Sequence, residues 1–165
     1  MRPRWALVAA AALILCACHP REITSLERKE AANIQSEADF AVTLRDWSRA
    51  EGLLAKAAAL CPDQGDTWMN LGIVRMRLHN PGGARSAYKS ALSAYEADSK
   101  RDKASSTSVI RRAYVLVVLG RADEARSLLN RERSDHPDDR RLRSFAESNG
   151  VAKMLADPGL KEISP

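Results

Sequence analysis

The sequence predicts an all-α fold built from helix–turn–helix repeats. Two alanine pairs, Ala50 with Ala84 and Ala57 with Ala91, recur at a spacing of 34 residues, and a fixed period of this size is typical of stacked helical units. Pro81 follows an asparagine between two apolar segments, which predicts a helix start because proline suits the first helical position. No segment of useful length alternates like a half-buried strand. Since one such unit cannot bury its apolar face alone, the repeats are expected to stack.

Length and composition indicate one compact domain preceded by a processing segment. The chain has 165 residues, of which 45% are hydrophobic, 28% charged and only 5% aromatic, as expected for helices packed through small residues. The formal net charge is +5 and falls to +3 if a leader containing Arg2 and Arg4 is removed. This charge is too small to indicate nucleic-acid binding, so no nucleic-acid partner is expected.

Residues 1–17 are organised like a secretory signal peptide. Arg2 and Arg4 form a positive start, and an apolar run of eleven residues, 5–15, follows. This run is shorter than the roughly 20 residues that span a bilayer, but it fits the apolar region of a signal.

The end of this segment, Leu15-Cys16-Ala17-Cys18, resembles the lipoprotein box of bacteria. The resemblance implies that Cys18 carries a diacylglycerol and becomes the new N-terminus, and two or more acyl chains hold a protein stably on a membrane. An ordinary cleaved signal with a soluble periplasmic product, or an uncleaved anchor, remains an alternative. His19 stands where aspartate favours inner-membrane retention in such lipoproteins, so the resemblance implies an outer-membrane lipoprotein facing the periplasm.

Cys61 is the cysteine that remains once Cys16 is removed and Cys18 acylated. No intramolecular disulfide is then expected, although the compartment permits one. Its place at the end of a helix predicts a core-filling residue; a reactive or partner-linking thiol is the alternative.

The first repeat is predicted at 31–64, after a segment 18–30 that holds the lipidated cysteine, a tether and the start of the first helix. Thr24 and Glu27 have capping-box spacing, and Asp46 is suited to cap the second helix, which should end near Cys61. The apolar stripe of the first helix is predicted at Leu26, Ala31, Ile34, Ala38, Ala41, Val42 and Leu44.

The second repeat, 65–98, has the most specific pattern. Trp68 and Gly72 are followed by Ala84 and Tyr88 at spacings that resemble the tetratricopeptide repeat (TPR). The resemblance covers roughly residues 31 to 139 and implies a solenoid of about three repeats. In that family the large aromatic residues at these places pack between helices, so no ligand role is expected for them.

The third repeat is predicted at 106–139 from Gly120, Ala125 and Pro137. Seven residues more than the period separate Ala84 from Ala125, which is close to two helical turns. Glu96 stands where a repeat would end with proline, so the preceding helix is expected to continue.

Residues 140–165 are predicted to form a capping helix and a tail. Asp138 and Asp139 are suited to start the helix, Asn149-Gly150 to stop it, and its arginines suit the solvated end of a solenoid.

The TPR resemblance also implies a binding face. In TPR arrays the first helix of each repeat lines a concave groove, which here should have an apolar floor that includes Val117 and should bind a protein or peptide. The residues carried over to this groove are Gln35, Met69, Asn70, Ile73, Met76, Arg77, Ile110, Arg111 and Tyr114.

One TPR binding mode clamps a C-terminal carboxylate with five residues. Asn70 and Arg111 match two of these places, but Asp39 would repel a carboxylate, so the full clamp is not expected. Residues 65–120 hold nine basic and four acidic residues. A solvated helix face explains this excess; an acidic partner or anionic lipid headgroups are the alternative.

Catalytic patterns are lacking in the sequence. His79 and His136 lie at predicted turns without cysteine or carboxylate neighbours at metal-ligand spacing, and no glycine-rich phosphate loop or nucleophile motif occurs. We therefore expect no enzyme, metal, cofactor or small-molecule substrate.

The sequence thus predicts a membrane-anchored TPR adaptor lipoprotein. Its plan, a lipoprotein box followed by TPRs, resembles small assembly lipoproteins of pili and secretion systems, including those of tight-adherence (Flp) pili. A structural scaffold or self-associating component of a cell-envelope complex is the alternative function.

Overall fold

The computed structural model describes residues 22–101 and 105–156, with side chains at 100 and 101 excepted. The predicted signal peptide 1–17, the predicted lipidation site Cys18 and the predicted tail from Asp157 lie outside these residues. Within the described ranges, no helix is both long and apolar enough to cross a membrane.

The described residues form eight α-helices and no strand, which confirms the prediction of an all-α fold. In chain order the helices are α2 (Ser25–Thr43), α3 (Trp47–Leu60), α4 (Gly65–Arg77), α5 (Pro81–Arg101), α6 (Ser106–Val118), α7 (Ala122–Asp135), α8 (Arg140–Glu147) and α9 (Gly150–Ala156).

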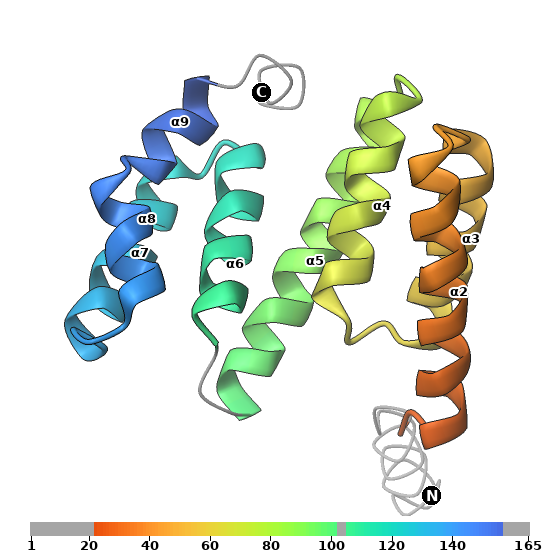
Figure 1. Ribbon diagram of the computed structural model, residues 1–165, viewed down its shortest axis with the longest axis horizontal. Coiled ribbons are helices and arrows are strands. Elements are labelled where there is room, and N and C mark those ends of the chain that lie inside the picture. Colours follow the sequence, from red (N-terminus) through yellow and green to blue (C-terminus); the bar gives the residue numbers. More distant parts are fainter. Residues whose placement is uncertain (1–21, 102–104, 157–165) are drawn as a thin grey trace, which may run out of the picture.

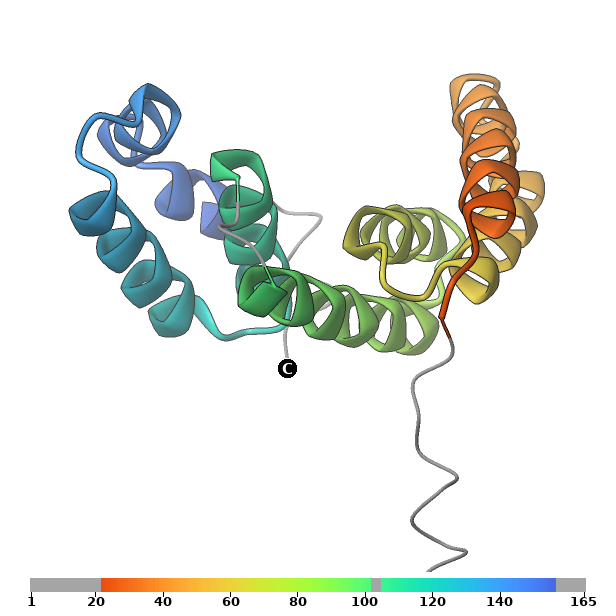
Figure 2. The same ribbon diagram turned by 90° about the horizontal axis from the view of Figure 1, so that it is seen from below.

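Helices that follow each other in the chain pack side by side as hairpins (Figure 1). The main pairs are α2 with α3, α4 with α5, and α6 with α7, while α8 and α9 cover the other end. Viewed from below, the pairs follow an arc in which α2, α4 and α6 lie on the inner side and α3, α5 and α7 on the outer side (Figure 2).

Side-chain caps start several helices where the sequence predicts them. Thr24 and Glu27 form a complete capping box at α2. Asp46 accepts a hydrogen bond from the Arg49 amide at α3, and Asp139 accepts two at the start of α8. These bonds satisfy backbone N–H groups that the first helical turn leaves without partners.

Two glycine–tyrosine pairs bring α4 and α5 together. A Cβ atom on Gly72 would lie 2.7 Å from the ring of Tyr88, and one on Gly65 would lie 2.6 Å from the ring of Tyr95. The two glycines and the two tyrosines are each seven residues apart, so the same contact is made twice, two turns apart along both helices. Because α5 continues to Arg101, as predicted, it carries the second tyrosine to the start of α4.

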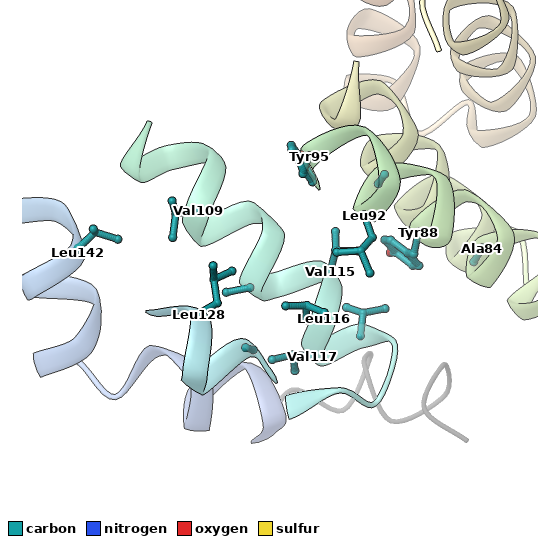
Figure 3. Close-up of a cluster of buried hydrophobic side chains, with 14 residues drawn as sticks. Ala84, Tyr88, Leu92, Tyr95, Val109, Val115, Leu116, Val117, Leu128 and Leu142 are labelled. Carbon is teal, nitrogen blue, oxygen red and sulfur yellow. The ribbon is translucent and has the colours of Figure 1, made fainter. Parts of the chain in front are cut away.

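Buried side chains form two core clusters. The smaller joins α2, α3 and α4 through residues such as Leu54, Leu71 and Val74. The larger joins α5 to α6, α7 and α8 (Figure 3). Trp68 contacts both clusters, and its indole N–H donates to the carbonyl of Pro62 at 3.0 Å, but it is only partly buried.

Several sequence predictions about burial need correction, while Cys61 is fully buried as predicted. Leu26 and Leu44 were expected in the buried stripe of α2 but are 73% and 59% exposed. The reason is that α2 packs chiefly against α3, so its opposite face has no helix to cover it. Val117, expected on the groove floor, is buried in the larger core cluster.

The C-terminal region also differs from the single predicted capping helix. Asn149 has a positive φ of 54° and ends α8, as predicted, but a further helix, α9, begins at Gly150. The ring of Phe145 occupies the space beside Gly150 where a Cβ atom would lie. A larger residue at position 150 would therefore prevent the close turn between the two helices.

Candidate functional site

A pocket of about 350 Å³ lies between α2, α4 and α6. We call it the central pocket. These are the helices on the inner side of the arc in Figure 2. Its lining consists of Ala32, Gln35, Gln64, Asp66, Thr67, Met69, Asn70 and Arg111. Four of the nine predicted groove residues, Gln35, Met69, Asn70 and Arg111, are thus brought together here.

Asp66 organises the charged side of the central pocket. Its carboxylate accepts a hydrogen bond from the hydroxyl of Tyr95 and pairs with the guanidinium of Arg111. Burial, followed by the hydrogen bond to Asp66, raises the pKa of Tyr95. Tyr95 therefore stays protonated and keeps donating at neutral pH. As a result, Arg111 lies in the pocket with its charge balanced by a carboxylate of the same chain.

Carboxamide groups supply the neutral polar side of the pocket. The buried hydroxyl of Thr67 lies 2.9 Å from Oε1 of Gln35 and 3.3 Å from Oε1 of Gln64, and its single proton serves one acceptor at a time. Within the described residues, the Asn70 side chain has no hydrogen-bond partner. Carboxamides both donate and accept, so they suit the N–H and C=O groups of a peptide main chain.

The remaining predicted groove residues lie elsewhere. Ile73, Met76 and Tyr114 are half-buried and pack against the larger core cluster. Tyr114 also interacts with Tyr88, whose pKa is raised first by burial and then by this neighbour. Arg77 is exposed near the end of α4, outside the central pocket. The apolar residues of the inner helices thus contribute largely to the core.

Ile110 lines a second hollow, of about 480 Å³, between α6 and α8. We call it the α6/α8 pocket. Its other lining residues are Arg140, Arg141, Ser144, Phe145 and Ser148. The sequence predicted these arginines only as solvating residues of a capping helix. The pocket forms only where α8 approaches α6, and this approach depends on the tertiary fold.

A third hollow, of about 290 Å³, lies where the start of α4 meets the end of α5. It shares Gln64 and Asp66 with the central pocket, and the ion pair of Arg28 and Asp63, 2.8 Å apart, closes one side of it. Tyr95 also lines it, and sequence reasoning missed this residue. Its spacing of seven from Tyr88, matched by Gly65 and Gly72, is a signal that would have identified it.

The described residues contain no group of three or more His, Cys, Asp and Glu side chains placed to hold a metal ion. No protein-family model matches the chain, and no curated protein matches it.

Proposed function

We propose that this chain is a TPR adaptor lipoprotein that binds an extended segment of a protein partner in its central pocket. Each predicted repeat, 31–64, 65–98 and 106–139, contains most of one helix pair, although α2 begins before 31 and α5 ends after 98, and this correspondence supports the assignment. The observation that carries the binding role is the central pocket itself, in which carboxamides and a charge-balanced arginine from three helices converge. Convergent polar groups in a hollow are the usual mark of a binding site.

The partner in this proposal is a peptide segment bound without catalysis and without a cofactor. The amide of Asn70 is available to a ligand main chain, while the Arg111–Asp66 pair adds polar contacts without a net charge. Because the charge of Arg111 is already balanced by Asp66, a ligand carboxylate would meet no net positive charge in the pocket. An internal segment of a partner, rather than a free C-terminus, therefore suits the central pocket.

The anchor in this proposal is an acylated Cys18 in the outer membrane, with the helices facing the periplasm. Six residues, 19–24, lie between Cys18 and the first residue of α2, so the pocket would stay close to the membrane surface. Lipidation would confine the search for a partner to two dimensions. Assembly of a pilus or a secretion system is the role that this plan resembles.

Photocrosslinking tests the proposed binding site. We would place a benzophenone amino acid at Asn70 in the full chain, and at Asn130 as the control, since Asn130 is exposed on α7. After irradiation of intact cells, a defined protein adduct should form from position 70 and not from position 130. The same adduct from both positions, or none from position 70, would remove the central pocket as the binding site.

Self-association as a scaffold component is the second candidate. Phe40 and Leu44, both more than half exposed on the uncovered face of α2, favour it. Large exposed apolar side chains that lie together on one helix mark contact surfaces. A dimer of the purified chain in light scattering would support this candidate over the adaptor.

A further inference from the structure

We infer that the α6/α8 pocket is a second subsite for the partner and binds a segment in which a carboxylate side chain adjoins a bulky apolar residue. This inference rests on the proposed function, because it assumes a protein partner on the inner side of the arc. It specifies which side chains the partner would have where it extends beyond the central pocket.

The floor of the α6/α8 pocket is apolar and held in place. Ile110 packs against the larger core cluster, and the ring of Phe145 is held against Gly150. Both side chains are only half-buried, so each still presents apolar surface to the hollow. A volume of about 480 Å³ lies in the usual range of ligand pockets and admits one or two bulky side chains.

The rim of the pocket is positively charged. Arg140 and Arg141 are exposed, and no carboxylate is among the lining residues. In the described part of the chain neither arginine forms an ion pair; the Arg141 side chain hydrogen-bonds the neutral hydroxyl of Thr107, and its backbone N–H donates to Asp139. The nearby carboxylate of Asp139 accepts hydrogen bonds from Ser106 and from the backbone of α8, which lower its pKa, and the charge of Arg141 lowers that pKa further without a direct ion pair.

The charge of its arginines distinguishes the α6/α8 pocket from the central pocket. In the central pocket Asp66 forms an ion pair with Arg111, whereas in the described residues neither guanidinium group of the α6/α8 pocket is in a direct ion pair. Guanidinium groups bind carboxylates through paired, charge-assisted hydrogen bonds. Charge complementarity therefore favours an acidic residue in the bound segment, and the apolar floor favours a bulky apolar residue next to it.

The two pockets are adjacent along the chain of α6. Ile110 lines one and Arg111 lines the other, and consecutive helical residues point about 100° apart, so the pockets lie on two sides of α6 and a single extended segment can cross α6 from one to the other. A lipid headgroup would match the arginines, but two apolar side chains offer an acyl chain little cover. A peptide therefore fits the pocket better than a phospholipid does.

Fluorescence anisotropy with two labelled peptides tests the inference. The acidic probe is Gly-Glu-Phe-Glu-Leu-Gly and the neutral probe is Gly-Gln-Phe-Gln-Leu-Gly, each titrated with the purified full chain. We expect the acidic probe to bind about tenfold more tightly, as two new exposed ion pairs allow. Added salt should reduce this difference by screening.

The variant Arg140→Gln/Arg141→Gln should abolish the preference for the acidic probe. The matched control Arg126→Gln/Arg133→Gln removes the same charge from α7, outside the pocket, and should keep the preference. Equal binding of the two probes by the unmodified chain, or equal loss in both variants, would overturn the inference. Charge-dependent binding to phosphatidylglycerol vesicles, without binding of the acidic peptide, would also overturn it.

The crosslink at Asn70 separates this inference from the proposed function. If the Arg140→Gln/Arg141→Gln variant still forms that adduct but the peptide preference is absent, the central pocket remains the binding site and the second subsite is wrong. If the adduct itself never forms, the proposed function fails, and the peptide titration alone decides the chemistry of the α6/α8 pocket.

Discussion

Replacing Gly65 by alanine tests the contact that connects the fold to the central pocket. The added Cβ atom would lie 2.6–2.9 Å from three carbons of the Tyr95 ring, whereas carbon atoms in contact prefer about 3.5–4.0 Å. Tyr95 is only 6% exposed, so the ring cannot move into solvent without leaving the larger core cluster. We therefore expect the ring to shift and its hydroxyl to separate from Asp66.

The magnitude follows from two opposing effects. Overpacking of a core contact costs about 1–3 kcal/mol, and replacing glycine by alanine in a helix returns at most about 1 kcal/mol. Gly65→Ala should thus lower the free energy of unfolding by about 1–2 kcal/mol. For a chain of this size the melting temperature should fall by roughly 2–8 °C.

The matched control is Gly52→Ala, because Gly52 is exposed in α3 and nothing lies within 4 Å of an added Cβ atom. This change should raise stability by about 0.5–1 kcal/mol through helix propensity alone. Urea unfolding followed by circular dichroism would measure both variants. If Gly65→Ala were stabilised as much as Gly52→Ala, the close contact with Tyr95 would not exist.

Three further changes test other parts of the molecule. Burial raises the pKa values of Tyr88 and Tyr95 above the ordinary value of about 10. Their contribution to the free energy of unfolding is therefore complete below about pH 10 and is lost as the pH rises above it. The variant Tyr88→Phe/Tyr95→Phe should lose less stability between neutral and alkaline pH, as measured by unfolding curves. If the chain self-associates, Phe40→Ser/Leu44→Ser should yield a monomer in light scattering with unchanged helicity, whereas an unchanged dimer would exclude this face. Mass spectrometry of the membrane-purified protein should find an acylated N-terminus at Cys18 that Cys18→Ser lacks, and an unmodified chain in the periplasm would disprove the anchor.

Local chemistry explains which parts of the fold the sequence could predict. The caps at Thr24, Asp46 and Asp139 depend on a side chain and amides at most three residues away, so their spacing in the sequence is sufficient. The second helix beyond Asn149 was missed because its position depends on the contact of Phe145 with Gly150, which involves helix packing.

The candidate site was only partly predictable for the same reason. The TPR resemblance implies groove positions for Asn70 and Arg111, and both line the central pocket. Periodicity does not decide whether an apolar residue on such a helix faces a groove or its neighbours, and Ile73 and Met76 pack against the core cluster. The α6/α8 pocket depends on how α8 approaches α6, which no repeat pattern specifies.

The departure from the repeat pattern at Glu96 connects these observations. A proline there would have ended α5 at about the position of Tyr95, since a residue before proline avoids the helical conformation. Without it, α5 continues to Arg101 and holds Tyr95 against Gly65 with its hydroxyl on Asp66. Asp66 in turn holds Arg111 and removes the net charge of the central pocket. In the proposed function, the continuation of α5 past Glu96 therefore explains why the central pocket suits a neutral segment, because it holds Tyr95 on Asp66 and Asp66 on Arg111.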